Sequence, residues 1–172
     1  MPIVELLPSA VDVDKLVIYQ YDETKFAKGT KIESIPIREP STVVDIVFKG
    51  TLASDGINVH DQFGHSVAFR FSDPADLEAI QNLFKVFDSL PLEDWQEQSF
   101  VKGETIWFRL KMDKKNEYVF TSNLKLKAKK PTDANLVHGE EITIVANPRV
   151  YFNHDQKTYG ISFTVKRFSA SQ

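Results

Sequence analysis

Hydrophobic and polar residues alternate with a period of two along much of this chain. The clearest case is the segment 104–112, in which four apolar residues at every second position are separated by Trp107, Arg109 and Lys111. Successive side chains of a β-strand point to opposite faces of the sheet, so this alternation predicts a strand with one buried apolar face. The other face of that strand would carry an indole between cations.

Other short runs in the first half of the chain also predict strands. One covers residues 16–21, and another begins at Ser41 and is expected to stop at Gly50. Residues 57–71 are expected to form a hairpin that turns near residues 62–64. Residues 25–41 are expected to be a loop or irregular, because three residues that interrupt regular elements occur there: Gly29, Pro36 and Pro40.

The period changes to three and four residues over about 74–88, which predicts the one helix of the chain. Asp73 or Ser72 would cap its first turn and Pro74 would occupy the first helical position. The apolar residues of this segment fall on one side of a helix and would face the core: Leu77, Ile80, Leu83, Phe84 and Phe87.

The rest of the chain is predicted to be strand and turn. After the indole-bearing strand, a turn at residues 113–116 would lead to a partner arm over 117–130 with lysines on its outer face. A strand over 139–153 is expected to be interrupted at Asn147-Pro148, and a turn at 154–157 leads to the last strand.

Five or more strands with one helix between them favour a closed or half-closed barrel, because closure removes exposed strand edges. We therefore expect a mainly β fold. The expected form is an OB-like antiparallel five-stranded barrel, plugged at the bottom by the helix and extended by additional N-terminal strands. At 172 residues, the chain is expected to be a single domain over 1–172.

The charge of the chain is divided unevenly between its two halves. The whole sequence carries 21 basic and 24 acidic residues, which does not favour general attraction to a polyanion. Residues 1–98, which include the helix, have 8 basic and 17 acidic residues, whereas residues 99–172 have 13 and 7. The β-rich part over 99–168 can therefore form a cationic groove. The alternative is that its lysines are solvated charges that protect strand edges: Lys115, Lys125, Lys127, Lys129 and Lys130.

Several classes of chemistry find little support in the sequence. Cysteine is absent, which excludes disulfides, thiol nucleophiles and zinc sites that need cysteine. His60, Asp61 and His65 have the residue types of a metal site, but they straddle a predicted turn where such residues are common. Neither a phosphate-cradling glycine loop nor a serine nucleophile elbow occurs. We therefore expect a protein that is not an enzyme and has no metal or cofactor.

Its expected location is intracellular and soluble. The sequence has no apolar run near the roughly 18 residues that span a bilayer. The start of the chain lacks the basic flank of a secretory signal. Membrane partners are not expected.

The closing segment from Gly139 to Phe168 carries a spaced set of residues in two consecutive strands. A leading glycine is followed by a Pro-x-x-Tyr element, a polar turn and a glycine-containing strand, at Gly139, Pro148, Tyr151 and Gly160. This pattern resembles the end of the single-stranded-DNA-binding replication proteins of bacteriophages and large DNA viruses. The resemblance covers residues 99–168.

The resemblance implies an OB-fold and binding of single-stranded DNA during replication, recombination or repair, at the site of viral or phage DNA replication in a host cell. It also implies replication proteins as partners. Many members of the family end in a long acidic tail that recruits them, whereas this sequence ends in FSASQ, which leaves that recruitment open.

Stacking of unpaired bases on aromatic rings, with cations on the phosphates, would bind single strands without reading their sequence. The residues expected to stack on bases are Trp107, Tyr151 and Tyr159, followed by Phe152 and Tyr118. The residues expected to contact phosphates are Arg109, Lys111, Lys125, Lys127, Arg149, Lys157 and Lys166.

Each aromatic candidate has a structural alternative. Tyr159 shares its parity with Ile161 and can be a core residue. Only one of Tyr151 and Phe152 can face outward, and the shared parity of Tyr151 and Arg149 favours Tyr151. Trp107 can instead pack under a loop or at a dimer contact. The corresponding alternative function is a β-barrel module for protein interaction or virion structure. The sequence leaves open the choice between DNA and RNA and whether the protein is a homo-oligomer.

Overall fold

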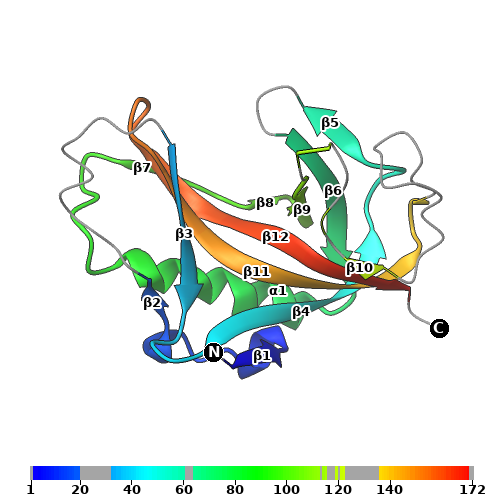
Figure 1. The fold of residues 1–172 in the computed structure, drawn as a ribbon, viewed down its shortest axis with the longest axis horizontal. Helices are drawn as coiled ribbons and strands as arrows, with labels where there is room; N and C mark the ends of the chain where they lie inside the picture. The colour runs from blue at the N-terminus through cyan, green and yellow to red at the C-terminus, as the bar shows by residue number, and fades with distance from the viewer. Residues whose placement is uncertain are drawn as a thin grey trace.

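The structure is a computed structural model that describes residues 2–19, 32–60, 64–112, 114–115, 119, 121–122 and 136–170. It is mainly β, and two long strands, β11 and β12, run side by side across the molecule (Figure 1). The strands are β1 (Ile3–Leu6), β2 (Val17–Ile18), β3 (Ile32–Arg38), β4 (Val43–Leu52), β5 (Asn58–His60), β6 (Gly64–Phe71), β7 (Gln96–Gln98), β8 (Val101–Lys102), β9 (Thr105–Leu110), β10 (Thr121–Ser122), β11 (Glu141–Asn153) and β12 (Thr158–Ala170). The helical elements are η1 (Pro8–Ala10), η2 (Val13–Lys15), α1 (Pro74–Gln81) and η4 (Asn82–Phe87).

The strands form a mixed sheet in the order β1-β4-β6-β9-β12-β11-β3-β2. β4 also pairs with β11, so the pairings lead from β4 through β6, β9, β12 and β11 back to β4. β1 is parallel to β4, and β12 is parallel to β7, β9 and β10, so the expectation of an antiparallel sheet is wrong for these pairs. β9 and β12 meet in a single residue pair, Arg109 with Thr164.

A cluster of phenylalanines fills the space between the strands. Phe48 of β4 lies at its centre and is fully buried. Its ring centroid lies 4.6 Å from that of Phe108 on β9 and 5.1 Å from that of Phe163 on β12. Phe69 and Phe71 of β6 complete the contacts at 6.0 and 5.4 Å. Four strands that are distant in sequence therefore share one aromatic core, in which edge-to-face pairs predominate.

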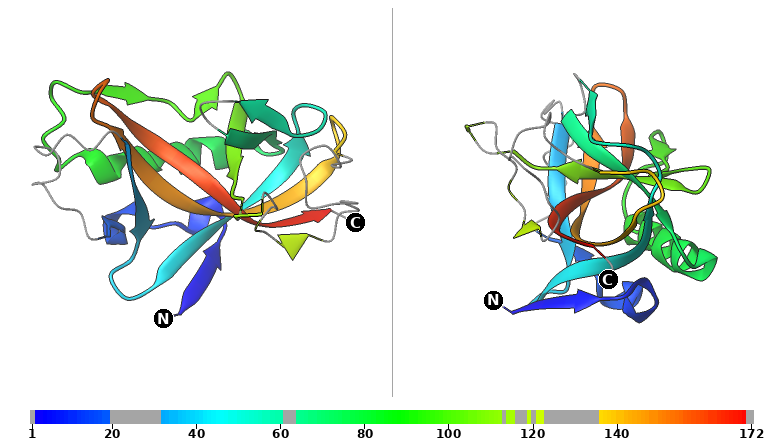
Figure 2. Two further views of the ribbon diagram at one scale, coloured as in Figure 1. Left: turned by 45° about the horizontal axis from the view of Figure 1, so that its top comes forward. Right: turned by 90° about the vertical axis from the view of Figure 1, so that its right-hand side faces the viewer.

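The predicted helix is confirmed. The Asp73 side chain accepts a hydrogen bond of 3.0 Å from the Ala75 amide, and Pro74 follows it at the first helical position. The α-helix ends at Gln81 and continues as the 3₁₀-helix η4 to Phe87. Ile80, Leu83 and Phe87 of the predicted stripe are buried, and α1 contacts η1 and β6 at one side of the sheet (Figure 2).

Two proline predictions are wrong. β3 is a strand despite Pro36, because the flanking Ile35 and Ile37 are buried and the β2 pairing ends one residue away, at Ile37. β11 is continuous through Pro148 because its neighbour changes there. β4 pairs with β11 up to Ala146, and β3 pairs with it from Arg149 onward. A residue without an N–H is tolerated where one partner strand ends and the next begins.

Gly50 lies within β4, which extends to Leu52, so the prediction that it ends the strand is also wrong. Gly50 pairs with Phe71 of β6 and with Ile142 of β11. A Cβ atom at this position would overlap the Arg70 carbonyl oxygen and lie 2.8 Å from the Phe69 ring. The absence of a side chain thus allows β4 and β6 to approach each other closely.

We predict that Gly50→Ala lowers the free energy of unfolding by about 1–3 kcal/mol, because the added methyl group must displace the β6 backbone. Urea denaturation measures this change. Gly103→Ala is the control. It has open space around the new methyl group but a backbone φ of 66°, so it costs about 1 kcal/mol from conformation alone. A Gly50→Ala protein as stable as wild type would show that β6 can move without cost.

The N-terminal strand β1 is attached to the C-terminal strand by an ion pair. Two nitrogens of Arg167 donate to the two carboxylate oxygens of Glu5, at 2.9 and 3.0 Å. The hydrogen bonds from Arg167 hold the pKa of Glu5 below its ordinary value. A lowered pKa in the folded state stabilises the protein above the pKa of the unfolded chain, and this stabilisation is lost as the pH falls through the folded pKa.

We predict that Glu5→Gln lowers the free energy of unfolding by less than about 1 kcal/mol at pH 7, because both partners are partly exposed to water. The difference from wild type should shrink at pH 3, because Glu5 binds a proton more readily in the unfolded chain than beside Arg167, so part of the stabilisation is lost as the pH falls. Urea denaturation at the two pH values tests this, with Glu93→Gln as the exposed control. A difference that is equal at both pH values would contradict the assigned role.

Candidate functional site

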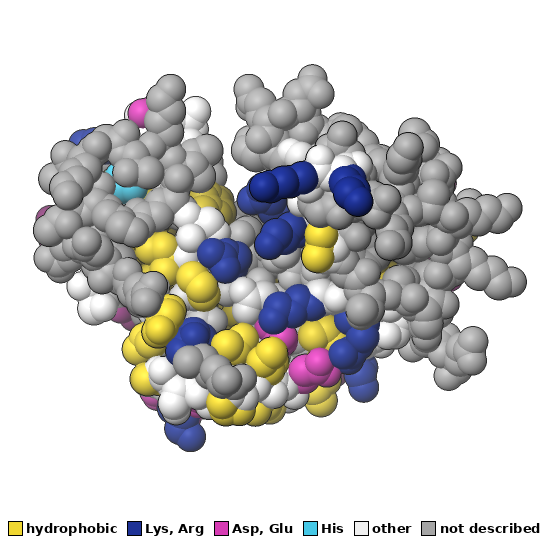
Figure 3. Space-filling model, viewed as in Figure 1, with side chains coloured by type: hydrophobic (Ala, Val, Ile, Leu, Met, Phe, Trp, Pro, Cys, Tyr) yellow, Lys and Arg dark blue, Asp and Glu magenta, His cyan; other side chains and the backbone are white. Residues whose placement is uncertain are grey.

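The outward residues of β9, β11 and β12 line a groove on one face of the sheet. We call it the basic groove. It has a volume of about 790 Å³ and is lined by side chains that include Arg109, Lys111, Arg149 and Lys166. Lys and Arg side chains gather along the middle of this face (Figure 3). The structure therefore brings together four of the seven predicted phosphate contacts: Arg109 of β9, Lys111 directly after β9, Arg149 of β11 and Lys166 of β12.

Strand alternation explains how these side chains reach the groove. In β9, Phe108 is fully buried while Arg109 is exposed, and in β12 Phe163 is fully buried beside Thr164. Thr164 pairs with Arg109 of β9 and with Asn147 of β11, so these three residues form one row across the sheet. The apolar residues needed for the core thus direct the intervening polar residues to the opposite face.

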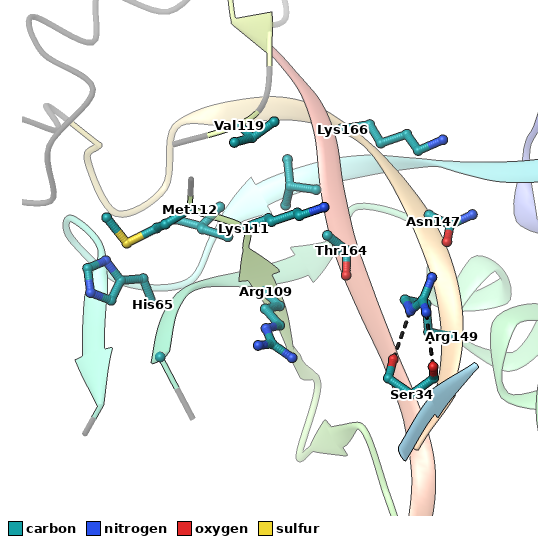
Figure 4. Close-up of a pocket in the computed structure, with 13 residues that line it drawn as sticks. Ser34, His65, Arg109, Lys111, Met112, Val119, Asn147, Arg149, Thr164 and Lys166 are labelled. Atoms are coloured by element: carbon teal, nitrogen blue, oxygen red, sulfur yellow. Dashed lines mark hydrogen bonds between the residues drawn. The ribbon is translucent and has the colours of Figure 1, made fainter. Parts of the chain in front are cut away.

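Arg149 is held in position by β3. Its Nε donates to the Ser34 hydroxyl at 2.8 Å, and its Nη2 donates to the Ser34 carbonyl oxygen at 3.0 Å. These bonds appear as dashed lines in Figure 4, which also shows Thr164 between Arg149 and Arg109. Burial and then the positive charge of Arg109 lower the pKa of Arg149. Two guanidinium groups are therefore near enough to repel each other.

Arg109 and Lys111 have no acidic partner in the part of the chain that the structure describes. The Asn147 side chain, which also lines the groove, instead donates to Asp45 at 3.1 Å. The groove thus has an excess of positive charge among its described residues. Such a surface attracts anions, and phosphate matches the planar donor array of arginine.

Lys166 lines the basic groove but serves a second purpose. Its Nζ lies 3.1 Å from the Oδ2 atom of Asp45, a carboxylate that is only 2% exposed. The register between β11 and β12 shifts so that Arg167 pairs with Val145 and Val165 with Ala146, which leaves Lys166 as an extra residue. This bulge directs Lys166 toward Asp45. Its charge neutralises a buried carboxylate, so Lys166 is a weaker phosphate candidate than the sequence indicates.

Tyr151 lies across Gly160, its partner on the neighbouring strand. A Cβ atom at Gly160 would lie 2.5 Å from the Tyr151 hydroxyl, so only glycine leaves room for the ring there. The hydroxyl donates to the Gln98 side chain at 3.0 Å, and burial raises the pKa of Tyr151. The ring shares the outward face with Arg149 and is partly exposed.

Two of the aromatic candidates belong to the core side of the sheet. Phe152 is fully buried and contacts Phe87 and Trp95, so its assignment as a stacking residue is wrong. The alternation that exposes Tyr151 requires this burial. Tyr159 packs edge-on to Phe87 at 4.7 Å, on the same side as Ile161, as the structural alternative predicted. Burial and the nearby charges of Glu97 and Asp88 raise the pKa of Tyr159, and an acidic neighbourhood of this kind disfavours phosphate.

Trp107 is 42% exposed and lies on the outward side of β9, two residues from Arg109. It pairs with Ala68 of β6, and none of the ring contacts between described residues involves its indole. Lys157 is exposed in the turn between β11 and β12, away from the basic groove, and its carbonyl oxygen accepts a hydrogen bond from Gln96. Tyr118, Lys125 and Lys127 lie outside the described residues.

Four residues of the site were not predicted: Ser34, Asp45, Asn147 and Thr164. Ser34 was hidden because the prolines around it predicted a loop. Thr164 and Asn147 share the parity of predicted site residues on their own strands and could have been found by that signal. Asp45 gave no signal, because only the fold brings it to Lys166.

No protein-family model matches the chain, and no curated protein is similar to it. The resemblance to phage and viral single-stranded-DNA-binding proteins therefore stays a prediction. None of the helices in the described part of the chain has the length and apolar content needed to cross a lipid bilayer.

We predict that Asp45→Asn lowers the free energy of unfolding by about 1–3 kcal/mol, because it removes the charged partner of Lys166 from a buried position. Urea denaturation at pH 7 measures the change. Glu141→Gln, which neutralises an exposed carboxylate of β11, should have little effect and serves as the control. Equal stability of the two variants would mean that the Asp45 network contributes nothing to the fold.

Proposed function

We propose that this protein binds single-stranded DNA without sequence preference and acts in DNA replication, recombination or repair. The observation that carries the proposal is the basic groove, which is lined by Arg109, Arg149 and Lys111. Trp107 and Tyr151, on the outward sides of β9 and β11, add exposed and partly exposed rings outside the groove lining. Cations in such a groove would follow a phosphate backbone, and the rings would stack on bases.

The form of the ligand follows from the two kinds of side chain. An anion alone would need only the arginines and lysine. Trp107 and Tyr151 add ring surfaces on the same outward face, and only bases without a complementary strand are free to stack on them. A duplex presents phosphates but keeps its bases stacked inside, so it would contact the cations and leave the aromatic rings without a partner.

The strand pairings support an OB-like barrel as the scaffold. The pairings from β4 through β6, β9, β12 and β11 return to β4, which is the connectivity needed to close a barrel of five strands. OB-folds bind oligonucleotides across an exposed strand face. The basic groove lies over three of these five strands, β9, β12 and β11.

The charge distribution limits binding to this face. The net charge of the chain is −3, so a polyanion is repelled by the molecule as a whole and attracted only where cations gather. Glu97 and Asp88, which lie near Tyr159 and away from the basic groove, add negative charge there and increase the difference in charge between that region and the groove. Affinity should accordingly fall steeply as salt screens the few productive contacts.

We predict that oligo(dT) quenches the tryptophan fluorescence of the protein and that added salt reverses the quenching. The chain has two tryptophans, so single variants assign the signal. Trp107→Phe should remove most of the quenching. Trp95→Phe should retain it, because Trp95 packs against Phe152 and His154. Trp107→Ala should weaken binding to all oligonucleotides alike, by about 1–3 kcal/mol for the lost stacking.

Duplex DNA of equal length is the matched ligand control and should bind more weakly. If oligo(dT) at low salt neither quenches fluorescence nor shifts anisotropy, the proposed function is wrong. Self-association or binding of another protein through Trp107 would then favour the alternative, a β-barrel module for protein interaction or virion structure.

A further inference from the structure

We propose that Arg109 and Arg149 hold a single phosphate group between them, and that Tyr151 stacks on a base next to that phosphate. This inference rests on the proposed function and deepens it, because it assigns one nucleotide unit to a defined place in the basic groove. The two arginines, the tyrosine and their register across β12 carry the inference.

The first step is the distance between the two arginines. They belong to β9 and β11, which lie on either side of β12, and Arg149 is two residues further along β11 than Asn147, the residue level with Arg109. Their backbones are therefore about 12 Å apart, diagonally across the sheet. Both side chains line the same groove, and the charge of Arg109 lowers the pKa of Arg149. The β12 residues paired with them are Thr164, beside Arg109, and Ser162, beside Arg149, and both have short side chains that leave space above them. Guanidinium groups extended from both sides can meet at one ligand.

The second step is the repulsion between these groups. Two like charges in a partly buried groove destabilise the empty state, and an anion placed between them removes that cost. Among described residues, the neighbouring carboxylate of Asp45 is already engaged by Lys166 and Asn147 and does not serve this purpose. A phosphate, with several acceptor oxygens, can bond to both guanidinium groups at once.

The third step is preorganisation. Ser34 binds Nε and Nη2 of Arg149, which fixes the guanidinium plane before any ligand arrives. The Nη1 group makes no hydrogen bond to the described residues and remains available to a ligand. A fixed side chain loses little conformational entropy on binding, which strengthens the contact.

The fourth step places the base. Tyr151 is two residues from Arg149 on the same face of β11, which is about 6.6 Å along the strand. Gly160 and Gln98 hold its ring across the neighbouring strand. The phosphate site and the stacking ring therefore lie in a fixed order along β11, with the ring nearer the turn at residues 154–157. A strand bound this way has a defined position relative to β11.

Binding of oligo(dT) at several salt concentrations tests the phosphate site. Arg109→Gln and Arg149→Gln should each reduce the log–log salt slope by about 0.7, the value for one phosphate on a single strand. The double variant should also lose about 0.7, because both arginines serve the same phosphate. Lys85→Gln removes an exposed charge from η4 and should leave the slope unchanged. A double variant that loses about 1.4 would assign a separate phosphate to each arginine and overturn the proposal.

An abasic oligonucleotide of equal length tests the stacking site. Tyr151→Leu should weaken oligo(dT) binding by about 5- to 150-fold, which corresponds to one lost stacking contact. It should leave binding of the abasic strand unchanged, whereas Arg109→Gln weakens both ligands. Equal losses on the two ligands in Tyr151→Leu would overturn the stacking assignment. Urea denaturation of every variant separates lost binding from lost folding.

A phosphate probe distinguishes failure of this inference from failure of the proposed function. Pyrophosphate should raise the thermal unfolding temperature of the wild type more than that of Arg109→Gln or Arg149→Gln. If oligo(dT) binds but the arginine variants behave like wild type, this inference is wrong and the proposed function stands. If neither oligo(dT) nor pyrophosphate has an effect on the wild type, both are wrong. A response to pyrophosphate without oligo(dT) binding would retain the phosphate site and reject the function.

Discussion

The structure depends on the hydrogen-bonded pairing of both edges of β11 with other strands. Along one edge it pairs with β12 over its whole length, and along the other it pairs first with β4 and then with β3. The pairing with β4 returns the sheet to its starting strand, and the pairing with β3 brings Ser34 to Arg149. The residue at the change of partner is Pro148, which has no N–H to leave unpaired. One strand thus joins the core, the scaffold and the basic groove.

Period-based prediction from the sequence succeeded where local chemistry and packing agree. The alternation in β9 correctly separated Phe108 from Trp107 and Arg109, and the change of period at Asp73-Pro74 located the helix and its cap. The parity argument also favoured Tyr151 over Phe152, and the burial of Phe152 bears this out. In these segments the side chain that the core requires is also the one that the local pattern indicates.

Prediction failed where a distant strand decides the outcome. Pro36, Gly50 and Pro148 predict interruptions when the local sequence is considered alone, but each lies within a strand. The β2 pairing ends beside Pro36, β6 approaches closely at Gly50, and the partner of β11 changes at Pro148. The same limit applies to the site. From the sequence alone, Lys166 is predicted to be an unpaired cation, but in the fold β4 brings the buried Asp45 to within 3.1 Å of it. A local sequence pattern cannot predict a contact between residues more than a hundred positions apart.

The single pair that joins β9 to β12 has a consequence for how the groove is shaped. Beyond Arg109 and Thr164, the two strands are held together by side chains, including Phe108 and Phe163 with ring centroids 5.8 Å apart. Backbone ladders fix a spacing of about 4.8 Å whatever the sequence, whereas a spacing set by ring contacts varies with ring size. The width of the basic groove on the β9 side therefore depends on the size of the buried rings, and substitutions in the core can change that width without altering any surface residue.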